Sequence, residues 1–145
     1  MVSPTLLVAT TQLPSIATGI RISLHVLAAA IFVGGQFTVA GLLGTIRGFG
    51  DGATKAVAHA FGRLQWPAYF ILILTGFWNV AAIHSGTTSH SWFVVLSIKI
   101  AVALLAGLFA YLHQRSRSRA QLAAFGGLAG IASLIALILG ALLSA

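Results

Sequence analysis

Long apolar runs alternate with short polar breaks along the whole chain. Four of these runs are long enough to cross the hydrocarbon core of a bilayer, which needs roughly 20 mostly apolar residues in a helix. They cover about residues 20–46, 64–83, 92–112 and 122–144. The pattern therefore predicts an all-α integral membrane protein, with a single domain over residues 1–145 in which four transmembrane helices form an antiparallel bundle.

The breaks between the runs have the composition of loops. Residues 47–63 contain several glycines and charged side chains, and we expect a loop there with one short interfacial helix from Ala53 onward. Residues 84–91 are polar, and residues 113–119 form a short basic break. Because a short connection makes its two helices antiparallel neighbours, we expect the third and fourth helices to pair.

The basic residues are distributed unevenly over the breaks. The second break has no lysine or arginine. The first and third breaks hold the basic residues Arg47, Lys55, Arg63, Arg115, Arg117 and Arg119. Since short basic loops are retained on the cytoplasmic side, we expect both of these loops inside and both termini outside, in a multi-pass protein of the cell inner membrane. Arg21, near the outer end of the first helix, is the one basic residue that opposes this orientation.

The composition supports the membrane prediction and excludes several other classes. Hydrophobic residues make up 59% of the chain and charged residues 6%, whereas soluble domains carry about 25% charged residues. The net charge is +7, but the basic residues are scattered between apolar runs, which excludes a nucleic-acid-binding face. The chain has no cysteine, so it has neither disulfides nor thiolate metal sites. The lipid bilayer is the partner that this composition predicts.

Three polar residues of the first helix form one stripe on an ideal helical wheel. Arg21, His25 and Gln36 fall within an arc of about 60° at 3.6 residues per turn. Ionisable groups inside a span cost roughly 2.5 kcal/mol or more and usually mark function. In the simpler alternative, Arg21 snorkels to the outer headgroups and His25 is a satisfied interior donor.

Lys99 is the most deeply placed charge in the predicted spans. It lies about 10 Å below the outer end of the third helix, at a rise of about 1.5 Å per residue. The only acidic residue, Asp51, is expected on the opposite side of the membrane. Lys99 therefore needs a carbonyl, a bound anion, a cofactor carboxylate or deprotonation, unless its stem simply snorkels to the outer surface.

The second helix adds a polar cluster of its own, made of Gln65, Thr75 and Asn79, although Thr75 commonly bonds back to its own helix in such a position. The fourth helix offers only Ser133 and Ser144 and is expected to be structural. We therefore expect a cofactor-binding site in the outer half of the first three helices. Its members are Arg21, His25, Asn79 and Lys99, with His84 and His90 at the outer rim.

The histidines suggest a metal. His25 with His84 or His90 forms an outer candidate set, and His59 with His113 forms an inner candidate pair. Haem b held between two imidazoles needs histidines on facing helices at matched depth, and imidazole also suits copper. In the simpler alternative, the histidines at the borders of the loops are interfacial residues.

Small residues on the fourth helix predict close packing. Gly126 and Gly130 are four residues apart, a spacing that lets two helix backbones approach each other in lipid.

Several short motifs together resemble a known family. They are the run from Leu24 to Gly35, Phe61-Gly-Arg63, Leu74-Thr75-Gly76, Lys99 and His113. In these residues the chain resembles the CopD-like membrane domain of bacterial copper-resistance proteins and, more distantly, the membrane protoporphyrinogen oxidase of the HemJ type. The resemblance implies that His25 and Lys99 belong to the site and that the site has a copper-related or haem-related role.

Two classes of function remain open at this stage. The first is a metal-binding protein that holds copper or haem iron in the outer half of the bundle, for transport or electron transfer. The second is a non-catalytic accessory subunit of a larger membrane complex, such as a respiratory one. A small transporter without cofactor is a third alternative, and it would need to form a homodimer to make a pathway. Soluble-enzyme signatures such as phosphate loops or HExxH are absent from the sequence.

Overall fold

The computed structural model describes residues 13–83 and 89–144. All regular elements in these two ranges are helical, which confirms the all-α class. The elements are α1 (Ile16–Ala29), the π-helical segment η1 (Ala30–Gly34), α2 (Gly35–Gly48), α3 (Asp51–Ala81), α4 (His90–Arg115) and α5 (Arg119–Ser144).

Three of the helices described are long and apolar enough to cross a membrane. They are the continuous helix formed by α1, η1 and α2, which has 33 residues, and α4 and α5, which have 26 residues each. The chain is therefore a multi-pass membrane protein. Helix α3 has 31 residues and is also long enough, but Gln65, Pro67 and Asn79 make its apolar half less hydrophobic than the other three helices.

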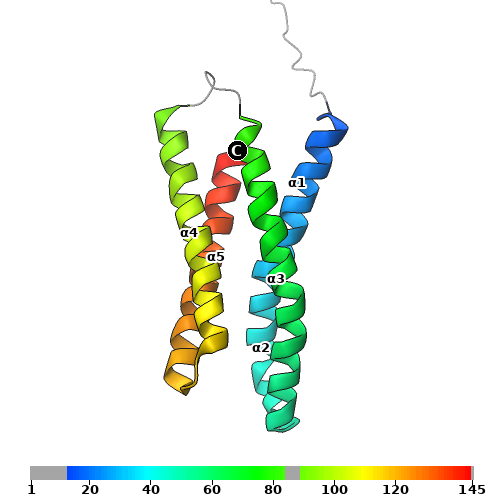
Figure 1. The fold of residues 1–145 in the computed structure, drawn as a ribbon, viewed down its shortest axis with the longest axis vertical. Coiled ribbons are helices and arrows are strands. Elements are labelled where there is room, and N and C mark those ends of the chain that lie inside the picture. Colours follow the sequence, from blue (N-terminus) through cyan, green and yellow to red (C-terminus); the bar gives the residue numbers. More distant parts are fainter. Residues whose placement is uncertain (1–12, 84–88, 145) are drawn as a thin grey trace, which may run out of the picture.

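The helices form two antiparallel pairs (Figure 1). The continuous helix α1–η1–α2 packs along α3, and α4 packs along α5 over most of its length. The predicted pairing of the last two helices is confirmed. The α2–α3 and α4–α5 connections lie at one end of the bundle, and the start of α1 and the end of α5 lie at the other (Figure 1).

The break predicted over residues 47–63 is mostly helical: the sequence predicts a short helix from Ala53 onward, whereas α3 begins at Asp51 and is long, continuing without a break into the next apolar run. The turn consists of Phe49 and Gly50, and Gly50 has a φ of 96°, a conformation that glycine adopts at little cost. The segment after it is rich in alanine, the best helix former, and this outweighs Gly52 and Gly62. The hydropathy pattern shows where the apolar run begins, at residue 64, whereas the helix itself begins at Asp51.

The core lies where the two helix pairs meet, at η1. It consists mainly of alanines, so the backbones approach closely: Phe32, Val33, Ala106, Ala110, Ala129 and Ala132. The ring of Tyr69 lies 4.9 Å from that of Phe32, and its hydroxyl donates to the carbonyl of Ala103 at 3.1 Å. Gly107 leaves the space that the Tyr69 ring occupies. This contact joins α3 to α4.

The two glycines predicted to mediate close packing behave differently. A Cβ at Gly126 would lie 3.0 Å from Nδ1 of His113, so Gly126 does make a close contact with α4. A Cβ at Gly130 would meet no other atom within 4 Å. The prediction is thus confirmed for Gly126, and for Gly130 it stays a prediction, since no other helix of the described chain comes that close to this residue.

Candidate functional site

His25 on α1 faces α3, where Thr75 is its partner. The two atoms His25 Nδ1 and Thr75 Oγ1 are 2.9 Å apart. The Thr75 hydroxyl donates its proton back to α3, to the carbonyl of Ile71 at 2.6 Å, as expected for a threonine within a helix. The hydroxyl therefore accepts from His25, so Nδ1 carries the imidazole proton and Nε2 carries a lone pair. The hydrogen bond also fixes the orientation of the imidazole ring.

Arg21 lies one turn before His25 and faces the same helix. Its Nη1 is 3.5 Å from the carbonyl oxygen of Trp78, which is a long hydrogen bond. Its Nε is buried and has no hydrogen-bond partner among the residues that the structure describes. The guanidinium thus retains donors for a further acceptor.

Lys99 on α4 directs its ammonium group toward α5. A Cβ at Gly140 would lie 3.1 Å from the Lys99 Nζ and 3.3 Å from its Cε, so the missing side chain of Gly140 makes room for the ammonium. Lys99 is half-buried and close enough to His25 to interact with it electrostatically. Asp51, the only acidic residue, begins α3 at the opposite end of the bundle. No acidic side chain among the described residues therefore balances the charge of Lys99.

The remaining members of the predicted outer site are less closely gathered. Asn79 is half-buried on α3, one turn after Thr75 and on the same face. His90 is exposed at the first position of α4. His84 lies outside the described residues. In the described part of the chain no group of three or more histidine, aspartate or glutamate side chains is arranged to hold a metal ion.

The predicted inner pair of histidines points in different directions. Nδ1 of His113 donates to the carbonyl of Leu122 on α5 at 2.8 Å, so this imidazole faces the α4–α5 connection. His59 is exposed on the first half of α3. His113 therefore contacts α5, and the structure does not bring it together with His59.

The predicted polar stripe on the first helix is divided. Gln36 donates through Nε2 to Oγ of Ser133 on α5 at 3.4 Å, whereas His25 faces α3. The π-helical segment η1 lies between the two residues and turns the following helix by roughly one residue relative to an ideal α-helix. An ideal α-helical wheel therefore places Gln36 on the wrong face of the first helix. Ser133, which sequence reasoning treated as part of a structural helix, is a buried polar partner.

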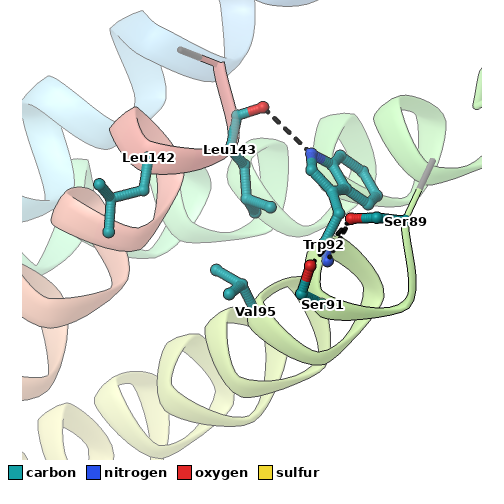
Figure 2. Close-up of a pocket in the computed structure, with 6 residues that line it drawn as sticks. All are labelled: Ser89, Ser91, Trp92, Val95, Leu142 and Leu143. Carbon is teal, nitrogen blue, oxygen red and sulfur yellow. Dashed lines mark hydrogen bonds between the residues drawn. The ribbon is translucent and has the colours of Figure 1, made fainter.

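A small cavity of about 200 Å³ lies between the start of α4 and the end of α5. Figure 2 shows Trp92 donating from Nε1 to the carbonyl of Leu143 at 3.3 Å across this cavity. Ser89 caps α4 by accepting from the backbone of Trp92 at 3.3 Å. The contact closes the end of the α4–α5 pair two turns beyond Lys99.

Comparison with protein-family models, curated proteins and solved structures gives no match for this chain. The resemblance to CopD-like and HemJ-type proteins therefore depends on the motif residues alone. The geometry of the site supplies the remaining argument for function.

Proposed function

We propose that the chain crosses the cell inner membrane four times, with α3 as the fourth span and both termini outside. At about 1.5 Å per residue, α3 is roughly 46 Å long, more than the hydrocarbon thickness of about 30 Å. Both basic connections lie at one end of the bundle (Figure 1), as a single cytoplasmic face requires.

The proposed function is binding of a metal species in the outer half of the bundle, for transport or electron transfer. The hydrogen bond between His25 and Thr75 is the observation that carries this proposal. Histidines that bind metals usually donate the other ring N–H to a neighbouring acceptor, which fixes the tautomer and the ring orientation. Thr75 supplies such an acceptor and leaves Nε2 of His25 as the ligand.

The charges around His25 favour haem iron over a copper ion. Arg21 and Lys99 are both basic and have no acidic side chain beside them in the described part of the chain, so a bare metal cation would be repelled by both. A haem carries propionates that would pair with the two cations. When bound, haem b would supply reversible one-electron chemistry. The residues of this chain would ligate it through His25, pair with its acidic groups through Arg21 and Lys99, and shield it from lipid.

The optical spectrum of the purified protein tests this proposal. After expression with haem and copper supplied, we expect a Soret band, or failing that stoichiometric copper. A preparation that contains neither would contradict the proposal.

The second candidate is an accessory subunit of a larger membrane complex, and one observation favours it. A lateral cavity of about 380 Å³ opens between α2 and α5, lined by Gln36, Phe37 and Ala40 on one side and by Gly127, Gly130 and Leu134 on the other. Small residues on a lipid-facing surface allow close approach of another helix. Native mass spectrometry in mild detergent tests this candidate, since a stable monomer or simple homodimer would argue against it.

A further inference from the structure

At the basic end of the bundle, α3 and α4 are joined by side chains near the membrane surface. Trp66 donates from Nε1 to Oε1 of Gln114 at 2.9 Å. A Cβ at Gly62 would lie 3.4 Å from Nε2 of the same glutamine, so α3 approaches this amide closely. These contacts fix the height of α3 relative to the last turn of α4.

Two aromatic rings and one guanidinium group lie around this contact, and a second arginine is close to it along α3. The rings of Trp66 and Tyr111 meet edge to face, with their centroids 6.5 Å apart. The guanidinium carbon of Arg115 lies 5.1 Å from the centroid of the Tyr111 ring. Arg63 is three residues before Trp66, which puts the two residues on neighbouring positions of one face of α3. An aromatic pair is thus flanked by one arginine from each helix pair.

This arrangement lies where a bilayer presents its headgroups. Tryptophan and tyrosine prefer the membrane–water interface. Helix α4 has 26 residues and is roughly 39 Å long, so its last turn extends beyond a hydrocarbon core of about 30 Å. The α2–α3 connection projects farther than the α4–α5 connection (Figure 1), so Arg47 and Lys55 lie beyond the level of Arg63.

Nothing acidic in the chain lies near these two arginines. Asp51 is twelve residues before Arg63 on α3, roughly 18 Å along the helix. Arg117 in the α4–α5 connection and Arg119 at the start of α5 add further positive charge at this end. Both arginines are exposed, so an anion from outside the chain can reach them.

We propose that Arg63 and Arg115 bind the phosphodiester headgroup of one anionic phospholipid, which bridges the two helix pairs at the basic end. Guanidinium groups match phosphate oxygens in geometry, and basic sites between transmembrane helices recognise anionic lipids. The headgroup would neutralise two like charges, one on α3 and one on α4, on either side of the contact between Trp66 and Gln114. Trp66 and Tyr111 cover the glycerol region of the same lipid. This site is separate from the proposed metal site, which lies at the other end of the bundle.

Quenching of Trp66 fluorescence tests the proposal. The variant Trp78→Phe/Trp92→Phe leaves Trp66 as the only tryptophan. It is reconstituted in phosphatidylcholine vesicles that contain a small, fixed fraction of either phosphatidylglycerol or phosphatidylcholine brominated near the headgroup. We expect the brominated phosphatidylglycerol to quench Trp66 about twofold more strongly, because the lipid is concentrated at the site. Equal quenching by the two lipids would overturn the proposal, and this comparison needs no arginine variant.

Two charge variants locate the site. Arg63→Gln/Arg115→Gln should abolish the preference for phosphatidylglycerol. The matched control Arg47→Gln/Lys55→Gln removes the same charge from the same end of the bundle and should keep the preference. If the control loses it equally, the attraction is diffuse and the site does not exist. Excess inorganic phosphate should leave the quenching unchanged, and competition by phosphate would show a site for soluble anions instead of a lipid.

Discussion

Nδ1 of His25 and Oγ1 of Thr75 lie 2.9 Å apart, and the threonine hydroxyl donates its own proton to the carbonyl of Ile71. One hydroxyl therefore links α1 to α3 and also determines which imidazole nitrogen carries the proton. Thr75 is 5% exposed, so water does not compete for this bond. In the proposed metal site, Thr75 is therefore a positioning residue for Nε2 of His25.

Replacing Thr75 with valine should weaken metal binding and lower stability together. The substitution keeps the side-chain shape but leaves the His25 N–H without its acceptor, at a cost of about 1–3 kcal/mol in unfolding free energy. Loss of a ligand-orienting partner typically lowers affinity about 10–100-fold. Titration of the detergent-solubilised protein with ferric haem and with Cu²⁺ measures the affinity. Thr75→Ser, which retains the hydroxyl, should bind nearly as the parent does, and an unchanged affinity in Thr75→Val would remove the positioning role.

Replacing Lys99 with methionine should preserve insertion and lower binding. Methionine keeps a long stem and removes an intramembrane charge that costs roughly 2.5 kcal/mol or more. Binding of ferric haem should fall because a cationic partner is lost. Lys99→Arg keeps the charge and should retain binding if a fixed charge is what the site requires. Full binding by Lys99→Met would exclude Lys99 from the site.

A substitution at Gly140 tests independently whether the position of the Lys99 ammonium matters for binding. A Cβ there would lie 3.1 Å from the Lys99 ammonium, so Gly140→Ala should displace that group and reduce haem affinity. Gly127→Ala, on the same helix where a Cβ meets no other atom within 4 Å, should leave affinity unchanged. Each substitution also gains roughly 0.5–1 kcal/mol of helix stability, so thermal unfolding separates the two effects. Equal affinities in the two variants would show that the ammonium does not need the space beside Gly140.

The absence of cysteine from the chain makes the orientation directly measurable. Single cysteines at Ser89, before α4, and at Ser118, in the α4–α5 connection, mark opposite ends of the bundle. In intact cells a membrane-impermeant maleimide should label Ser89→Cys and should label Ser118→Cys only after the membrane is permeabilised. The reverse pattern would place the basic connections outside and contradict the proposed orientation.

Sequence reasoning identified the helices and their pairing because hydropathy and loop length act over many residues. It also selected Arg21, His25, Asn79 and Lys99, since polar groups in apolar helices stand out from their neighbours, but it did not predict that Thr75 is the partner of His25. It missed η1 and therefore the bond between Gln36 and Ser133, because a π-helical segment forms through packing and has no signal in the local composition. The early start of α3 at Asp51 was missed for a different reason, since hydropathy does not report helix that extends beyond the membrane.

Absorption spectroscopy of His25→Ala beside His59→Ala, after expression with haem supplied, tests the central claim most directly. His25 Nε2 is the proposed ligand, whereas His59 is exposed on the part of α3 near the basic end. We predict that His59→Ala retains the Soret band of the parent protein and that His25→Ala loses it, with both variants present in the membrane at parental levels. A Soret band that persists in His25→Ala, or one that disappears only in His59→Ala, would contradict the account.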